Sequence, residues 1–354
     1  MLFRSALPGP VFMHTLTPVT CTPRPPHCPN PNCLHHKPSP QPWPVVRFGR
    51  FPRQTPPFVV QRYRYRACGR TFSDQTFSPS YWLKRPELLA EVLKHAVSGA
   101  ANRQVARLLG AAPATVDHQL ARLGRRCLLF QRHFASQASP AGDIALDGLV
   151  TFEHSQYLPY EIVAAVDRPS SFVLHFCEAE RRRSGTMTAG QRRRRAQLEQ
   201  RHGRADRHAL RRALQEVLGE ALQGSVRAKV VSDKHPAYPG VVAQVKGCVV
   251  EHVRIDSRAP RTALNPLFEV NLLDLLLRHC LKDHTRETIA FGKRRAHSMY
   301  RAAVFVVWRN FVKWRRERRC RQTPAMVRQV VDRRLTEQEV LARRLFVSHY
   351  ELPP

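Results

Sequence analysis

Acidic residues are scarce in this chain of 354 residues. Asp and Glu number 27 against 58 Lys and Arg, which gives a formal net charge of +31 at pH 7. Because such an excess of one sign repels itself in the folded state, it indicates a polyanionic partner, and nucleic acid is the simplest one. Codon bias in a GC-rich genome would explain the excess of Arg over Lys, but it does not explain the shortage of acids.

Long apolar runs are also lacking. No run approaches the ~18 residues that a membrane span needs, and Pro8 and Pro10 interrupt the segment where a signal peptide would lie. The nine cysteines are odd in number and scattered, which argues against a disulfide framework and for reduced thiols. We therefore expect a cytoplasmic, nucleoid-associated protein without a membrane partner. Its length predicts two or three domains.

The first 58 residues are too rich in proline to form a helix. Residues 1–20 are expected to be disordered. The stretch from Phe58 to Tyr65 alternates apolar or aromatic with polar residues, as a half-buried strand does. We interpret residues 21–80 as a zinc-ribbon-like region that has lost part of its pattern.

Three cysteines of this region have the spacing of metal knuckles. Cys28 and Cys33 belong to the segment CPNPNC, and Cys68 belongs to YRACGRTFS. The second segment resembles the C-x-x-C-G-R-T-F-S signature of zinc-ribbon transposases, with Tyr65 in place of the first cysteine. Structural zinc requires four ligands in a closed tetrahedron, so the fourth would have to come from another residue, or the region is a relic that no longer binds zinc. The residues that could supply the fourth ligand are His27, His35, His36 and Cys21.

Residues 81–138 have the pattern of a helix-turn-helix domain. Apolar residues recur at helical spacing from Leu88, a second helix is expected from Asn102, and a third follows Pro113. The small Ala106 allows close helix crossing, and Gly110 permits the positive φ of the turn. A plain helical bundle is the alternative. The side chains expected to reach DNA bases or phosphates are Thr115, Asp117, His118 and Arg122.

The pattern of residues 139–318 predicts an α/β domain with a mixed sheet and flanking helices. The order is three strands, a helix, a strand, a helix, a strand and then helices, which is typical of a ribonuclease-H-like domain. The expected strands lie at residues 144–150, 161–166, 171–176, 228–232 and 248–255. Helices are expected from residue 268 onward and over residues 294–316, and a C-terminal helical tail over residues 319–354.

Three carboxylates in this domain suggest its chemistry. Asp147 lies on the first strand, Asp233 ends the fourth, and Glu269 begins a later helix, with 35 residues between it and Asp233. The first and fourth strands of a ribonuclease-H-like sheet are neighbours, so the two Asp side chains should converge. Such carboxylates hold two Mg²⁺ ions for in-line attack on a phosphodiester. Asp274, four residues before Arg278, is the alternative third acid.

The order of these parts resembles bacterial insertion-sequence transposases of the zinc-ribbon, helix-turn-helix and DDE type. The segment with Leu277, Arg278, Thr288 and Lys293 is similar to the one that follows the third acid in that family. The resemblance implies cleavage and strand transfer of DNA with Mg²⁺ or Mn²⁺. It implies that the partner is double-stranded DNA, namely the transposon ends and the target. It also implies a homo-oligomer on DNA. The alternatives are a decayed or domesticated copy that only binds DNA, and a nuclease without strand transfer.

A basic insert is expected within the catalytic domain, over residues 178–206. We expect its central arginines to neutralise DNA phosphates without reading sequence. A solvated basic face is the simpler interpretation. These arginines are Arg192, Arg193, Arg194 and Arg195.

Overall fold

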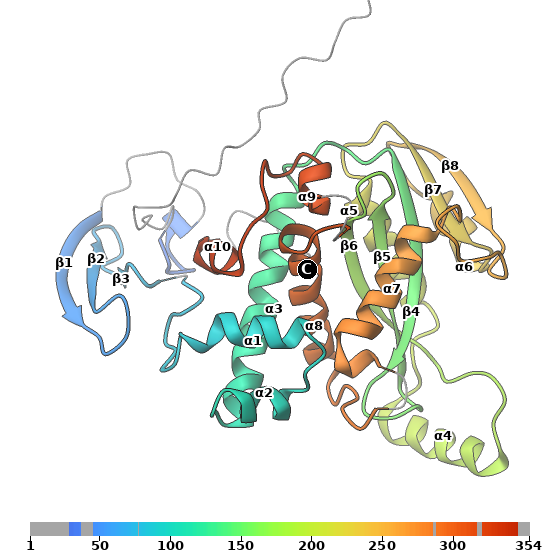
Figure 1. Cartoon of the computed structure of the whole chain (residues 1–354), viewed down its shortest axis with the longest axis horizontal. Coiled ribbons are helices and arrows are strands. Elements are labelled where there is room, and N and C mark those ends of the chain that lie inside the picture. Colours follow the sequence, from blue (N-terminus) through green and yellow to red (C-terminus); the bar gives the residue numbers. More distant parts are fainter. Residues whose placement is uncertain (1–27, 37–44, 77, 286–287, 317–320, 346–354) are drawn as a thin grey trace, which may run out of the picture.

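A computed structural model of the chain describes residues 28–36, 45–76, 78–285, 288–316 and 321–345. It contains a three-stranded sheet near the N-terminus and a five-stranded sheet in the larger part of the molecule. Helices lie between and around the two sheets (Figure 1). No helix in the described part of the chain combines the length and the apolar character that a membrane span needs.

The five-stranded sheet is mixed. Its order is β6-β5-β4-β7-β8, so the first strand in the chain is central. The first three strands pair antiparallel, while β7 runs parallel to both β4 and β8. This is the strand order of a ribonuclease-H-like sheet and confirms the mixed α/β fold expected from the sequence. The strands are β4 (Asp143–Phe152), β5 (Pro159–Asp167), β6 (Phe172–Glu180), β7 (Arg227–Asp233) and β8 (Val249–Ile255).

Helices cover this sheet. Helix α5 (Ala209–Ala221) packs on β5 and β6, whereas α7 (Phe268–Cys280) packs on β4 and β5. Both helices bury apolar residues at helical spacing, which anchors them to the sheet. The short α6 (Ala237–Val242) follows β7 and contacts α5 and β8. These contacts hold the ends of β4 and β7 next to α6 and α7.

Helices α1 (Leu88–Val97), α2 (Asn102–Leu108) and α3 (Pro113–Ala135) form the expected three-helix unit. Ala106 is buried, and Gly110 has a φ of +56° in the turn between α2 and α3. We expected a domain boundary between residues 138 and 139, but one hydrophobic core extends across it. The reason is α3, which packs along α8 (Arg295–Val307), a helix that follows the five-stranded sheet in the chain (Figure 1).

The N-terminal sheet consists of β1 (Val45–Pro52), β2 (Val59–Tyr65) and β3 (Thr71–Ser73), all antiparallel. The sequence predicts β2 but not β1, because β1 has no buried residue and therefore no alternation of apolar and polar positions. A small separate core of Cys28, Tyr63, Tyr65 and Phe72 supports the sheet.

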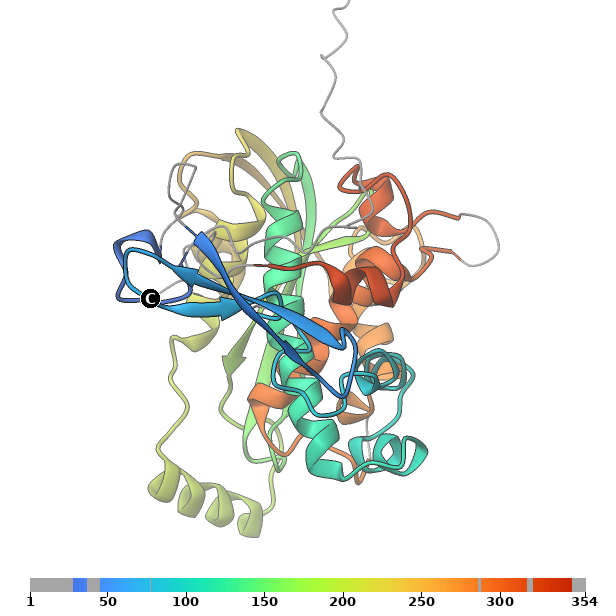
Figure 2. The same cartoon turned by 90° about the vertical axis from the view of Figure 1, so that its left-hand side faces the viewer.

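Two helical segments differ from expectation. The basic insert contains a helix, α4 (Ala189–His202), whose first turn is stabilised by a capping box from Thr188 and which buries no residue. Figures 1 and 2 show α4 projecting from the body of the molecule. The helix expected to reach residue 316 ends earlier, because α8 passes into a π-helical turn, Trp308–Val312, and then into extended chain. In the C-terminal tail, α9 (Pro324–Val327) and α10 (Glu337–Ala342) are short.

The contact between α3 and α8 allows a test of this shared core. A Cβ atom on Gly124 of α3 would lie 2.2 Å from the Cβ atom of Tyr300 on α8, so the two helices could not keep their spacing. We expect Gly124→Ala to reduce the free energy of unfolding by about 1–3 kcal/mol, the usual cost of overpacking. Thermal or urea unfolding of the whole chain measures it.

Gly219→Ala is the matched control. Gly219 also lies in a helix, α5, but a Cβ atom there meets nothing within 4 Å. This change should stabilise the protein by roughly 0.5–1 kcal/mol, because alanine is the better helix former. Equal effects of the two substitutions would contradict the close packing of α3 on α8.

Candidate active site and cysteine cluster

The pairing of β4 with β7 brings two acids together. The parallel register joins Asp143 to Lys229 and Ala145 to Val231, and the same register continued by two residues brings Asp147 opposite Asp233. The electrostatic interaction between the two carboxylates confirms that they are neighbours. Asp233 ends its strand, and its Oδ1 accepts a hydrogen bond of 2.8 Å from the backbone N–H of His235.

Asp274 of α7 joins this pair. It follows the buried Val270 by four residues, so it lies on the side of α7 that faces the sheet. Burial, and then the negative charge of Asp147, raise the pKa of Asp274 well above its usual value. The carboxylate of Asp274 is therefore close enough to Asp147 to repel it.

Glu269 lies elsewhere on the same helix. Because it precedes Asp274 by five residues, the two side chains leave α7 in directions about 140° apart around the helix axis. Its Oε1 lies 3.6 Å from Nη2 of Arg315, and its side chain is only 13% exposed. It also faces the buried Arg309, whose pKa burial lowers to about 10. The structure therefore brings Glu269 to a pair of arginines beyond α8, and it brings Asp274, the alternative, to Asp147.

Burial dominates the electrostatics of Asp147. It raises the pKa of this carboxyl to about 6; the backbone N–H of Gly148 lowers the pKa and the charge of Asp233 raises it further. The Gly148 N–H donates to Oδ1 of Asp147 at 2.8 Å. Asp147 consequently carries its negative charge at neutral pH at a cost in stability, which a bound cation would relieve.

Tyr238 on α6 lies among these acids. Burial raises its pKa, and the charges of Asp147, Asp233, Glu161 and Asp274 raise it further. Its hydroxyl also lowers the pKa of Asp147 through a hydrogen bond. Tyr238 was not predicted as a site residue, and its only signal in the sequence is its position five residues after Asp233.

The charge of the three Asp side chains is not balanced by ion pairs. Among the ion pairs that the structure describes, none involves Asp147, Asp233 or Asp274, whereas the nearby Glu161 pairs with Arg181 at 3.2 Å. Arg278, four residues after Asp274 on α7, and the exposed Arg261 lower the pKa of Asp274, and Arg261 also lowers that of Asp147. Half-buried carboxylates that form no described ion pair fit the oxygen ligands of Mg²⁺ or Mn²⁺.

The three cysteines of the N-terminal region converge as predicted. The sulfur atoms of Cys28, Cys33 and Cys68 all lie within 4.8 Å of one another, and the distance from Cys28 Sγ to Cys68 Sγ is 3.5 Å. The backbone N–H of Asn30 points at Cys28 Sγ, also at 3.5 Å. Three thiolates at this separation fit three corners of a zinc tetrahedron.

Tyr65 lies beside the three sulfurs. Burial raises its pKa, and the charges of Cys33, Cys28 and Cys68 raise it further. Neither His35 nor His36 belongs to the group of ligand atoms that the described residues bring together: the ring of His35 contacts Tyr65 edge-to-face, and His36 Nδ1 lies 2.9 Å from the Cys28 carbonyl oxygen. His27 and Cys21, the other two candidates for a fourth ligand, lie outside the described residues.

The residues predicted to read DNA have different surroundings. His118 is exposed on α3, and Thr115 is half-buried. Asp117 instead accepts a hydrogen bond from Asn102, the first residue of α2. Arg122 donates to the carbonyl oxygen of Tyr81 at 2.6 Å and to that of Pro79 at 3.4 Å. Asp117 and Arg122 therefore hold the helical unit and its preceding loop together, which the sequence pattern did not indicate.

The exposed end of the helical unit carries other basic and polar side chains, which sequence reasoning missed. On α2 the solvent-facing positions include Arg103, Gln104 and Arg107, and on α3 they include Arg125. A helix-turn-helix pattern identifies the buried positions first, so the exposed ones follow only when the packing of α3 on α8 is known.

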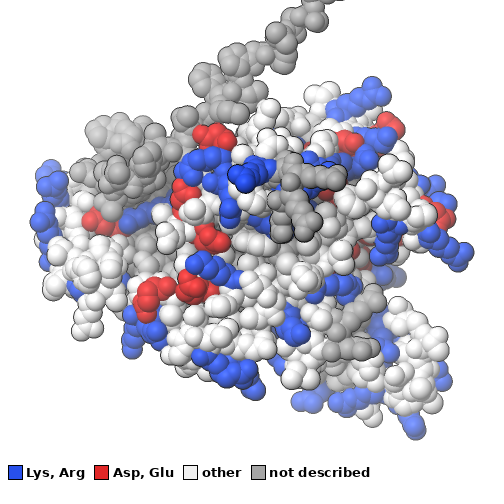
Figure 3. All heavy atoms as spheres, in the orientation of Figure 1, with Lys and Arg blue, Asp and Glu red and all other residues white. Residues whose placement is uncertain are grey.

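The arginines of α4 differ in exposure. Arg192, Arg193 and Arg194 are exposed, but Arg195 is half-buried and donates to the Arg183 carbonyl oxygen at 2.9 Å. Figure 3 shows basic side chains spread over much of one face, including the lower right, where α4 projects.

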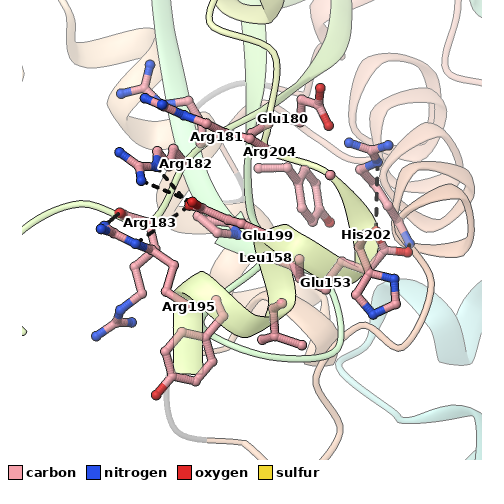
Figure 4. Close-up of a pocket in the computed structure, with 17 residues that line it drawn as sticks. Glu153, Leu158, Glu180, Arg181, Arg182, Arg183, Arg195, Glu199, His202 and Arg204 are labelled. Atoms are coloured by element: carbon pink, nitrogen blue, oxygen red, sulfur yellow. Dashed lines mark hydrogen bonds and ion pairs between the residues drawn. The ribbon is translucent and has the colours of Figure 1, made fainter. Parts of the chain in front are cut away.

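A small cavity of about 140 Å³ lies at the base of α4, next to the loop that follows β4. Figure 4 shows Arg182, Arg183 and Arg195 gathered around Glu199. The distances from Glu199 to Arg182 are 2.8 and 3.0 Å, and Arg195 lies at 3.6 Å. Glu199 therefore ties α4 to the end of β6, at the same end of the sheet as the C-terminus of β4.

The raised pKa of Asp147 predicts how stability changes with pH. A folded-state pKa of about 6 means that the folded chain binds this proton more tightly than the unfolded chain. The contribution of Asp147 to stability therefore falls as pH rises from about 4 to about 6. Without divalent metal, Asp147→Asn should match the wild type near pH 4 and exceed it by on the order of 1 kcal/mol above pH 6.

Unfolding by urea at several pH values measures this difference. Asp256→Asn is the control, because Asp256 is an exposed acid whose pKa is lowered, first by the backbone N–H of Arg258. It should show no gain in stability with rising pH. A difference between Asp147→Asn and wild type that stays constant from pH 4 to pH 7 would contradict the buried charge.

The cysteine cluster predicts metal binding that depends on three thiolates. Freshly purified protein should contain close to one zinc ion per chain, and Cys33→Ser should lose most of it. Tyr65→Cys should bind zinc at least about tenfold more tightly than the wild type, because it would add a fourth thiolate to the tetrahedron. Tyr65→Phe is the matched control. Elemental analysis measures the zinc content, and competition with a chelator measures the zinc affinity. Absence of zinc from the wild type would favour the interpretation of this region as a relic that no longer binds zinc.

Comparison with protein-family models and with curated proteins gives no match. Comparison with solved structures finds similarity to the crystal structure of the catalytic domain of Mos1 mariner transposase. The sequence identity is 14%, the match covers 55% of this chain and 91% of that chain, and the TM-score is 0.22. A likeness this weak carries no argument about activity, so the ribonuclease-H-like assignment rests on the strand order described above.

Proposed function

We propose that this protein is a DNA transposase that cleaves and joins phosphodiesters at an acidic site formed by Asp147, Asp233 and Asp274. The observation that carries the proposal is the convergence of three half-buried carboxylates, from the middle of β4, the end of β7 and α7, none of which forms a described ion pair. Asp274 replaces Glu269 as the proposed third acid, because Glu269 already pairs with Arg315.

The three carboxylates would hold two Mg²⁺ or Mn²⁺ ions. Bound there, the metals would activate water, and then a 3′ hydroxyl, for in-line attack on a phosphodiester. Asp147 and Asp233 come from neighbouring strands and Asp274 from a packed helix, so the ligands are preorganised. A hydrogen bond from the Tyr238 hydroxyl lowers the pKa of Asp147 and would help to keep this carboxylate charged for metal binding. The exposed Arg261 is close enough to lower the pKa values of Asp147 and Asp274, and it would contact the phosphate that enters the site.

DNA would lie along the basic surfaces on either side of this site. Arg192, Arg193 and Arg194 are exposed on α4, at the end of the sheet where β4 terminates, and they would neutralise phosphates. His118, together with the exposed positions of α2, would contact the transposon ends. Zinc held by Cys28, Cys33 and Cys68 would stiffen the N-terminal sheet. A homo-oligomer on DNA remains part of this proposal.

A DNA-binding protein that no longer cuts is the rival. Tyr65 favours it, because this side chain stands where the resemblance calls for a thiolate. A nuclease without strand transfer is a further alternative. Substitution of the acids distinguishes the first rival from a transposase, because only an enzyme has cleavage to lose. Detection of joined DNA products distinguishes the second rival, because a nuclease does not join strands.

Cleavage by the acid variants tests the proposal. The substrate is a plasmid that carries the terminal inverted repeats flanking the gene, in Mg²⁺ or Mn²⁺. Asp147→Asn, Asp233→Asn and Asp274→Asn should each lower the cleavage rate by at least about a hundredfold, since each removes a charge that the metals need while keeping shape. Gel analysis of nicked and joined products measures both steps.

Glu269→Gln is the matched control on the same helix. It should lose stability, because Arg309 and Arg315 lose their acid, but it should keep cleavage within a few fold of wild type. If Glu269→Gln abolishes cleavage while Asp274→Asn cuts normally, the third acid is Glu269. If all three Asp variants cut as well as wild type, the protein is not a metal-dependent transposase of this kind.

A further inference from the structure

A second hollow lies far from the acids, between the N-terminal sheet and the segment that leads to α1. Its volume is about 500 Å³, which is within the range of sites that hold small ligands. Strands β1, β2 and β3 form one wall, and residues 81–84 form the other. Figure 2 shows the N-terminal sheet in front of the helices.

Trp82 is the most unusual residue of the hollow. It is 82% exposed, and its φ is +60°. A bulky residue rarely adopts left-handed backbone, and such a conformation persists only where the surroundings impose it. Tyr81 lies beside it, with ring centroids 5.9 Å apart in an edge-to-face arrangement. The chain therefore holds an indole ring out into solvent against both hydrophobic burial and backbone preference.

Helix α3 imposes this conformation. Arg122 donates to the carbonyl oxygens of Tyr81 and Pro79 at 2.6 and 3.4 Å. On the other side of Trp82, the Gln119 side chain donates to the carbonyl oxygen of Arg85 at 2.9 Å. Two side chains of α3 thus hold the backbone on both sides of Trp82. The aromatic surface is preorganised, so a ligand that stacks on it does not have to order the loop.

The charged side chains that line the hollow are basic. Arg53, Arg62 and Lys84 line it, and among the described residues no acid is part of the lining. The Arg62 guanidinium lies over the ring of Phe48, 5.3 Å from its centroid, which extends the basic and aromatic surface along β1. Exposed rings alternating with cations suit a ligand that combines flat aromatic groups with negative charges, as nucleotides do.

We propose that this groove binds an unpaired nucleotide of single-stranded DNA, with the base stacked on Trp82 and the phosphates against Arg53, Arg62 and Lys84. The base must be unpaired, because the faces of a base in a duplex are covered by its neighbours. The choice of DNA over RNA rests on the proposed function, while the stacking site itself rests on the groove. The site would serve strand ends or melted ends, which the duplex-reading helices do not recognise.

Binding of short oligonucleotides to the full-length chain tests the proposal. The probes are labelled single-stranded poly-dT, its RNA counterpart and a duplex of equal length, without added divalent metal, so that cleavage does not contribute. Trp82→Ala should weaken binding of single-stranded DNA by roughly fivefold to a hundredfold, the range for loss of one stacked base. Its affinity for the duplex should stay within about twofold of wild type. Fluorescence anisotropy measures the affinity for each of the three probes.

Two variants separate stacking from general effects. Trp82→Phe keeps an aromatic face, so it should retain most of the affinity but lose the quenching of tryptophan fluorescence that single-stranded DNA causes in the wild type. Phe58→Ala is the matched control, because Phe58 is another exposed aromatic residue of the same region that does not line the groove. It should bind every probe like wild type.

The outcomes are distinct from those of the cleavage assay. If Trp82→Ala binds single-stranded DNA as tightly as wild type, or loses single strand and duplex equally, the groove is not a stacking site for unpaired bases. If only RNA binding depends on Trp82, the ligand class is wrong. Unchanged cleavage in the acid variants, with Trp82-dependent binding intact, would overturn the proposed function and leave the stacking site standing. Loss of cleavage in the acid variants, without Trp82-dependent binding, would overturn the stacking site and leave the proposed function standing.

Discussion

The parallel pairing of β4 with β7 is the contact on which the candidate active site depends. It aligns Asp147, in the middle of β4, with Asp233 at the end of β7, and α7, which packs on the sheet, adds Asp274. These acids are half-buried and repel one another, so their position is unfavourable unless a cation binds between them. The hydrophobic packing of the central strand must therefore compensate for this repulsion. An active site held in this way combines a stable scaffold with locally unfavourable electrostatics.

The packing of α3 on α8 joins the three-helix unit to the region of the five-stranded sheet. Because Gly124 allows α3 and α8 to approach closely, helices α1, α2 and α3 share one hydrophobic core with the sheet. They are therefore fixed relative to the acids and do not swing on a linker. Arg301 of α8 strengthens this connection by donating to the Ala100 carbonyl oxygen at 3.0 Å. DNA held by the helical unit would consequently have a defined direction toward the ends of β4 and β7.

The distribution of charge follows a simple division. The acids of the candidate site are half-buried, whereas exposed arginines lie on α4, on the N-terminal sheet and on α2 and α3. Some arginines are nevertheless structural, because Arg122 and Arg315 donate to groups within the protein. The high net charge therefore overstates the number of side chains that can contact DNA. The exposure of each arginine, and not its place in a cluster along the sequence, distinguishes arginines that could contact DNA from those that are structural.

The sequence alone predicted the strand order and the three-helix unit, because period-two and helical patterns report which faces are buried. It also pointed to Asp147 and Asp233 through the expected sheet, and to the three cysteines through their spacing. Only the tertiary structure shows that Asp274 lies near Asp147 and that Glu269 lies near Arg315. The two residues are five positions apart on one helix, so only the packing of α7 reveals which of them faces the sheet. The same holds for Trp82, whose exposure depends on hydrogen bonds from α3, a helix more than thirty residues away in the chain.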